Sequence, residues 1–175
     1  MNNNNNTMNN NNINTNLPLE LNSILIGIML SDGGLYRSSP TANVRFEMSF
    51  GEKYKSLAFH IGELFKDYMS NPVKPVEIKG KNKVYINYRL KTKTLPVFNS
   101  YYEMFYKFNH LTNKYVKIVP TNINDLMDPI VLAYLIQGDG NFDQWILSIG
   151  AKNLDLLRKI VIPYFHLTML YRLGL

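Results

Sequence analysis

Two aspartates that each close a run of apolar residues are the first candidates for chemistry in this sequence. Asp32 follows residues 21–31, and Asp139 ends a second apolar stretch that starts at Pro129; a glycine follows each aspartate. Both runs are apolar on nearly every side, as in buried helices, and glycine commonly ends a helix. A carboxylate at a helix C-terminus costs about 0.3–1 kcal/mol because it faces the negative end of the helix dipole. A divalent cation bound by both carboxylates would remove that cost, so the pair predicts a Mg²⁺ site of hard oxygen ligands.

Small residues in the two predicted helices allow their backbones to approach closely. These positions are Gly27, Ser31, Ala133 and Gly138. If the helices pack there, their ends meet, and we expect Asp32 and Asp139 to lie side by side at the centre of the molecule. Asp-Gly is also a common turn dipeptide, but its recurrence at the ends of two similar helices favours a function.

The sequence between these helices predicts a mixed α+β unit. Residues 44–50 alternate between apolar and polar side chains, as a half-buried strand requires. A β-hairpin is expected between residues 75 and 90, with its turn at residues 79–82. Helices are expected over residues 52–68 and 94–108. In the second strand of the hairpin, the residues expected to face the core are Val84, Ile86, Tyr88 and Leu90.

The chain contains an internal repeat whose second copy is short. The two aspartates are 107 residues apart, but only 36 residues follow Asp139. The second copy has no counterpart of residues 35–78. We therefore divide the chain into an Asn-rich tail expected to be disordered (1–16), a first repeat (17–123) and an incomplete second repeat (124–175).

Positive charge is concentrated in the middle of the chain. From Arg37 to Lys117 there are 15 basic and 6 acidic residues, a net charge of +9, whereas the rest has a net charge of −3. Such a concentration is typical of a surface that binds a polyanion, although a well-solvated surface is the alternative. Because cysteine is absent, disulfide scaffolds, thiolate zinc sites and cysteine nucleophiles are excluded. The longest apolar runs, 24–30 and 129–136, are far shorter than the ~20 residues that span a bilayer, so we expect no membrane partner.

Two nonamers at the predicted helix ends resemble the signature motifs of the LAGLIDADG homing endonuclease family. They are LIGIMLSDG at residues 25–33 and LAYLIQGDG at residues 132–140. Residues 45–50, 117–120 and 169–173 also resemble the mitochondrial intron-encoded, single-chain members. The resemblance implies an α+β fold of two pseudo-symmetric αββαββα halves, the second truncated, with saddle-shaped sheets over the DNA major groove. It also implies a mitochondrial, organelle-encoded protein, in keeping with the lack of an evident import signal.

The resemblance further implies a DNA endonuclease that hydrolyses phosphodiester bonds with Mg²⁺. The residues implied at the metal site are Asp32, Asp139, Gly33 and Gly138. Lys117 occupies the place of a basic residue near the first-half active site, and Arg172 occupies the place of the second-half lysine. Their implied roles are to orient water and to offset transition-state charge. Arg172 departs from the family pattern, and because arginine does not deprotonate, it is unsuited to relay a proton.

DNA recognition is expected on the outward faces of the strands, with double-stranded DNA as the partner. Donors and acceptors for base edges are expected from Arg45, Glu47, Ser49, Tyr85, Asn87, Arg89 and Lys91. Phosphate contacts are expected from Lys79, Lys81 and Lys83, and Lys93 is expected on the same surface.

Two other functions are compatible with the sequence. The same basic saddle suits a maturase that binds intron RNA and assists splicing without cutting. The second alternative is a degenerate remnant that binds nucleic acid weakly or not at all. The short second copy favours it, because the missing elements would leave part of the hydrophobic core uncovered. Self-association with a partner chain is one way to complete that half. The three histidines, His60, His110 and His166, are too widely separated for a ββα-metal motif or a zinc triad.

Overall fold

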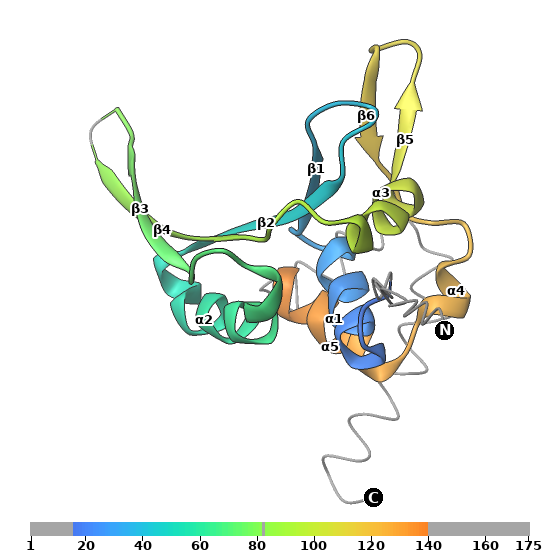
Figure 1. The fold of residues 1–175 in the computed structure, drawn as a ribbon. Coiled ribbons are helices and arrows are strands. Elements are labelled where there is room, and N and C mark those ends of the chain that lie inside the picture. Colours follow the sequence, from blue (N-terminus) through green and yellow to red (C-terminus); the bar gives the residue numbers. More distant parts are fainter. Residues whose placement is uncertain (1–15, 82, 140–175) are drawn as a thin grey trace, which may run out of the picture.

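The computed structural model describes residues 16–81 and 83–139 and contains one αββαββα unit followed by a hairpin and two helices (Figure 1). Predictions for the Asn-rich tail to residue 15, for Asn82, and for the second repeat beyond Asp139, Arg172 included, lie outside these residues. The helices are α1 (Leu19–Leu30), α2 (Lys55–Leu64), α3 (Asn99–Phe105), α4 (Ile123–Leu126) and α5 (Pro129–Asp139). The strands are β1 (Gly34–Arg37), β2 (Val44–Gly51), β3 (Lys74–Lys79), β4 (Val84–Lys91), β5 (Tyr106–Asn109) and β6 (Lys114–Lys117).

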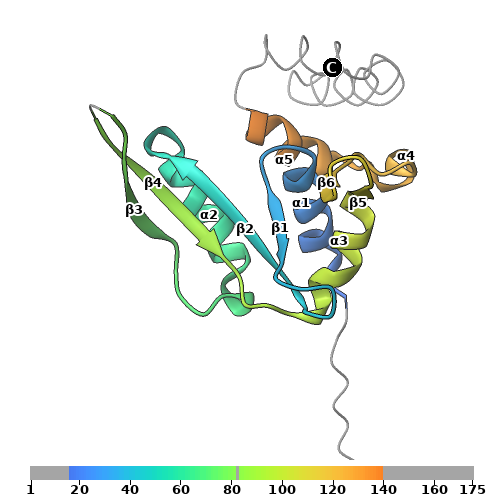
Figure 2. The ribbon, with the colours of Figure 1, turned by 90° about the horizontal axis from the view of Figure 1, so that it is seen from above.

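Strands β1 to β4 form one antiparallel sheet in the order β1-β2-β4-β3, and β5 and β6 form a separate two-stranded hairpin. In Figure 1 helices α1, α2 and α5 lie below the four-stranded sheet, and its upper face is open. Figure 2, the view from above, shows the long β3–β4 hairpin reaching away from α1 and α5. The first seven elements follow the predicted order α-ββ-α-ββ-α.

The core lies between the lower face of the sheet and the helices. The predicted alternation in residues 44–50 is confirmed, because Val44, Phe46, Met48 and Phe50 of β2 are buried. The ring of Phe46 packs on Phe65, at the end of α2, with 5.2 Å between centroids. None of the described helices is long and apolar enough to cross a membrane.

The predicted helix over residues 52–68 is divided, with single 3₁₀ turns at Glu52–Tyr54 and Lys66–Tyr68 on either side of α2. The predicted helix over 94–108 is wrong at its C-terminal end. A 3₁₀ turn (Pro96–Phe98) leads into α3, which stops at Phe105 because the next four residues pair with β6. Phe108, at the end of the predicted helix, instead faces Tyr115 across the hairpin, with 5.3 Å between the ring centroids.

The expectation that all four apolar residues of β4 face the core is only half right. Tyr88 and Leu90 are buried, but Val84 and Ile86 are 54% and 44% exposed. Val84 and Ile86 lie on the same face of β4 as the buried pair. The hairpin, however, extends beyond α2 (Figure 1), and no described residues cover its outer end. Strand alternation predicts which face a residue occupies but not what packs against that face.

Candidate active site and nucleic-acid interface

Helices α1 and α5 lie side by side in Figures 1 and 2 and touch at glycines. A Cβ atom on Gly27 would lie 2.4 Å from the carbonyl oxygen of Val131 and 2.9 Å from Cβ of Tyr134. A Cβ atom on Gly138 would lie 2.1 Å from Oγ of Ser31. These distances are shorter than any normal contact of a Cβ atom, so a residue with a side chain at either position would push the helices apart. The close approach therefore requires both glycines. The structure therefore brings three of the four predicted small residues to this contact.

The fourth predicted residue, Ala133, is not part of the contact. It is exposed, whereas Val131 and Leu132, which precede it, are buried. The helix rotation turns Val131 and Tyr134 toward Gly27 instead. The motif alone could not fix this rotation, because α5 is apolar on nearly every side.

The start of α5 is fastened to α1 through Asp128. Oδ1 of Asp128 accepts hydrogen bonds from the backbone amides of Ile130 (2.7 Å) and Val131 (2.8 Å), as a helix-capping carboxylate does. Its other oxygen accepts a hydrogen bond from Oγ of Ser23 in α1 at 2.5 Å. One capped end and two glycine contacts thus fix the alignment of the two helices.

This alignment places the C-terminal ends of α1 and α5 together. The Cβ position of Gly138 is 4.0 Å from the backbone nitrogen of Asp32, which is exposed. The amide of Gly33 donates to the carbonyl of Ile28 at 3.0 Å and ends the helix. Asp139 is the last residue of α5 and follows Gly138 directly; its side chain is outside the described residues. The two helix ends are therefore adjacent, as predicted.

Lys117 brings a positive charge to the end of α1. Its Nζ donates hydrogen bonds to the carbonyl oxygens of Ser31 (2.8 Å) and Gly33 (2.6 Å), one on each side of Asp32. These carbonyls form the negative end of the α1 dipole, which stabilises a cation. The predicted proximity of Lys117 to Asp32 is therefore present in the structure, whereas the Gly33 carbonyl, predicted at the metal site, binds an ammonium group.

The base of the β5–β6 hairpin holds Lys117 at this position. Tyr106 is the cross-strand partner of Lys117, and its hydroxyl oxygen accepts a hydrogen bond from the amide of Leu35 at 3.2 Å. The ring of Tyr106 stacks on Tyr102 at 4.6 Å between centroids, and burial raises the pKa of the Tyr102 phenol. The amide of Ile118 closes the base by donating to Phe105 at 2.7 Å. Tyr106 was not predicted from the sequence, although its alternation with Phe108 was the signal for a strand.

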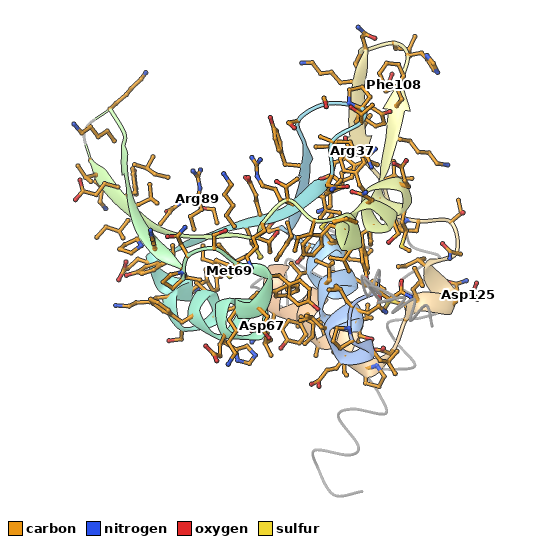
Figure 3. All side chains as sticks on the ribbon, viewed as in Figure 1. Arg37, Asp67, Met69, Arg89, Phe108 and Asp125 are labelled. Carbon is orange, nitrogen blue, oxygen red and sulfur yellow. The ribbon has the colours of Figure 1, made fainter. Side chains whose placement is uncertain are left out.

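The upper face of the four-stranded sheet carries the predicted base contacts. Glu47 lies opposite Lys91, and Ser49 lies opposite Arg89, in the register of β2 and β4, so the outward residues of the two strands share this face. Figure 3 shows Arg89 extending from the sheet on the side away from the helices. The predicted residues brought together here are Arg45, Glu47, Ser49, Tyr85, Asn87, Arg89 and Lys91.

Arg45 is held on this face by two neighbours. Its guanidinium lies 4.0 Å from the centroid of the Tyr36 ring, and its Nε donates to the Glu47 carboxylate. A cation–π contact and an ion pair restrict the rotamers of the side chain. Tyr36, which was not predicted from the sequence, is thus a component of the face, and its outward position in β1 was the available signal.

The predicted lysines are distributed differently. Lys79 pairs with Val84 and lies on the opposite face of the β3–β4 hairpin. Lys81 is in the exposed turn, and Nζ of Lys83 lies 5.7 Å from the ring centroid of Tyr85. Lys93 does not extend the row of β4, because the strand ends at Lys91 and Nζ of Lys93 donates to the carbonyl of Asp67 at 3.2 Å.

The described residues contain no group of three histidine, cysteine, aspartate or glutamate side chains that could hold a metal ion. The described carboxylate at the meeting of the helix ends is that of Asp32. A divalent cation there would need a further carboxylate from the end of α5, where the sequence has Asp139.

Comparison with known proteins agrees with this geometry. Residues 22–161 match the family model of the LAGLIDADG DNA endonuclease family. DNA endonuclease I-ChuI of Chlamydomonas applanata is 26% identical over 135 residues, which are 75% of this chain and 62% of that protein. The chain thus spans less than two thirds of this relative.

A solved structure, homing endonuclease I-WcaI bound to its DNA recognition sequence, superposes with a TM-score of 0.61. The match has 20% identity and covers 73% of this chain and 55% of that one, so the likeness concerns the fold. Because the family model matches most of the chain, including both helix motifs, the protein belongs to the LAGLIDADG DNA endonuclease family.

Proposed function

We propose that this chain is a site-specific endonuclease that hydrolyses phosphodiester bonds of double-stranded DNA with the help of Mg²⁺. The observation that carries the proposal is the meeting of three groups at one place. Asp32 follows α1, Gly138 brings the end of α5 against Ser31, and the Lys117 ammonium binds the carbonyls that flank Asp32. The relative I-ChuI is named a DNA endonuclease, which supports the same activity.

The donor atoms at the helix ends suit a hard divalent cation. The carbonyls of Ser31 and Gly33 lie at the negative end of the α1 dipole, where they hold the Lys117 ammonium beside Asp32. The exposed carboxylate of Asp32, together with that of Asp139, supplies the oxygen ligands that Mg²⁺ prefers. When bound, Mg²⁺ polarises the scissile phosphate and lowers the pKa of the attacking water.

Lys117 has a separate role in this proposal. The two carbonyl hydrogen bonds hold its ammonium beside Asp32, where it offsets negative charge that develops on the phosphate during hydrolysis. A cation placed before the reaction needs no reorganisation as that charge appears. The lysine therefore acts by electrostatic stabilisation, whereas Asp32 acts as a metal ligand.

The open face of the sheet supplies the DNA-binding surface. Arginine and asparagine side chains offer paired hydrogen bonds to guanine and adenine edges in the major groove. Arg45, Asn87 and Arg89 present such groups on one face of β2 and β4. Homing endonuclease I-WcaI, whose structure superposes on this chain, was solved bound to its DNA recognition sequence. By analogy of fold, we assign this face to the DNA duplex.

The proposal is tested by cleavage of a randomised plasmid library in the presence of Mg²⁺, with the breaks mapped by sequencing. We expect cuts at one preferred sequence and a rate reduced by roughly 10²–10³-fold in Asp32→Asn, because an uncharged amide is a much weaker metal ligand. Asp125→Asn is the matched control, because Asp125 lies in α4, away from the open face of the sheet (Figure 3). Cleavage retained in Asp32→Asn would exclude the metal assignment.

Binding to RNA is the outcome that would redirect the proposal. The same chain is tested in filter binding against structured intron RNA and against the DNA duplex that lacks the intron. The endonuclease proposal requires tighter, sequence-dependent binding to the DNA. Preferential RNA binding without DNA cleavage would indicate a maturase instead.

A further inference from the structure

A cleft at the outer edge of the open face carries an inference beyond the base-reading residues. It has a volume of about 350 Å³ and lies between the segment 70–72 and strands β3 and β4. Three of the side chains that line it are basic, namely Lys74, Arg89 and Lys91, and none is acidic. The register places Lys74 directly opposite Arg89 on the face that also holds Ser49.

The cleft exists because the pairing of β4 with the preceding chain is interrupted. Thr92 bridges to Met69, and Arg89 pairs with Lys74. Two residues of β4 therefore face four residues of the other segment, 70–73, and the longer segment bows away from the strand. The gap that this mismatch opens lies beside Lys91.

The segment around the cleft is held at both ends by buried side chains. Met69 is 8% exposed and Val73 is 7% exposed. A Cβ atom on Gly62 of α2 would lie 2.4 Å from Cγ2 of Val73, so the segment seats directly on the helix. Pro72 restricts the backbone between these anchors. The shape of the cleft is therefore set before any ligand binds.

One basic side chain is already positioned at the edge of the cleft. Nζ of Lys74 donates a hydrogen bond to Oδ1 of Asn71 at 3.1 Å, and Asn71 also lines the cleft. The Glu47 carboxylate, opposite Lys91 in the register, is paired with Arg45. The three basic groups are therefore available to a ligand with a negative charge.

We infer that this cleft binds one phosphodiester group of the DNA backbone, with Lys74 as its principal new ligand. The inference rests on the proposed DNA-binding function and assigns Lys74 to affinity rather than to base recognition. A single phosphate fits the chemistry, because the ammonium groups of Lys74 and Lys91 at this cleft attract a small, negatively charged oxyanion group, and the Arg89 guanidinium is left to the base edges. The cleft lies at strand β3, the outer edge of the sheet, where a duplex seated on the central strands presents its backbone.

The test measures the affinity of the full chain for a labelled DNA duplex as a function of salt, without Mg²⁺. Each neutralised phosphate contributes about 0.9 to the slope of log affinity against log salt. Lys74→Ala should lower the slope by about that amount, so that the loss of affinity between about 50 and 200 mM salt shrinks by about 3.5-fold. Lys74→Arg should keep the wild-type slope. Target and random duplexes should weaken alike.

Lys66→Ala is the matched control. It removes the same charge on the other side of the segment, where Lys66 is 61% exposed and pairs with Glu63. Equal slopes for Lys74→Ala, Lys66→Ala and the wild type would overturn the cleft assignment and leave the proposed function intact. A changed ranking of target sequences in Lys74→Ala would also overturn it, by showing a base contact. A wild-type chain that binds no duplex would refute both proposals.

Discussion

Two β-hairpins of the described chain, β3–β4 and β5–β6, rise above the helices in Figure 1 but are supported in different ways. The β3–β4 hairpin is an extension of the four-stranded sheet, and α2 covers only its inner part. The β5–β6 hairpin has no third strand in the described chain. It is fixed at its base by the Tyr106 hydroxyl, the Ile118 amide and the Lys117 ammonium.

This difference separates two tasks. The long hairpin presents a row of polar side chains, each at its own register position, and this arrangement suits contact with a long surface such as DNA. The short hairpin delivers one ammonium group to one pair of carbonyls. A position in an active site needs tighter control than a position in a binding surface, since a displacement of about 1 Å can cost 10²-fold in rate.

The largest effect that this comparison predicts is on the chemical step. Lys117→Met keeps a side chain of similar length but removes the cation at the end of α1. We expect single-turnover cleavage to slow by roughly 10²–10³-fold, as on removal of one electrostatic donor from an active site. The dissociation constant for DNA should change much less, because one charge among many is removed.

Lys114→Met is the control for this variant. Lys114 is an exposed lysine of the same strand, and it pairs with Asn109 at the outer end of the hairpin. Its removal should leave the rate near the wild-type value. Equal slowing of cleavage in Lys117→Met and Lys114→Met would contradict the role given to the Lys117 ammonium at the end of α1.

A smaller effect is expected from the contact that fixes the hairpin base. In Tyr106→Phe the amide of Leu35, a residue only 6% exposed, loses its acceptor. A buried donor left unsatisfied costs about 1–3 kcal/mol, and we expect the free energy of unfolding in urea to fall by that amount. Cleavage should slow while DNA affinity stays the same, because Lys117 is less well held.

Tyr115→Phe supplies the comparison for that measurement. Tyr115 is 51% exposed, so the loss of its hydroxyl group should change stability little. Identical unfolding curves for Tyr106→Phe and Tyr115→Phe would contradict the role given to the Leu35 contact.

The sequence allowed the helix pair to be predicted because its signals are local and repeated. Asp32 and Asp139 follow similar apolar runs, and the glycines that permit close packing lie within the same motifs. Alternation in residues 44–50 likewise predicted β2 correctly. These features depend on residues within a few positions of each other, which a single sequence displays directly.

The features that were missed depend on contacts between distant segments. Whether Tyr106 and Phe108 belong to a helix or a strand is decided by pairing with β6. Lys93 was expected on the DNA-facing side, but its partner is a carbonyl 26 residues earlier. The exposure of Val84 and Ile86 follows from the length of α2, which the residues of β4 do not encode.

The smallest predicted effect concerns the outer end of the long hairpin. Because Ile86 is 44% exposed, Ile86→Thr should change the free energy of unfolding by less than about 0.5 kcal/mol. Leu90→Ala in the same strand is the contrast, because Leu90 is fully buried and such truncations cost about 2–5 kcal/mol. A large loss of stability in Ile86→Thr would mean that another surface covers the outer end of the hairpin in solution. The long hairpin would then be supported along its whole length, and its contrast with the short one would disappear.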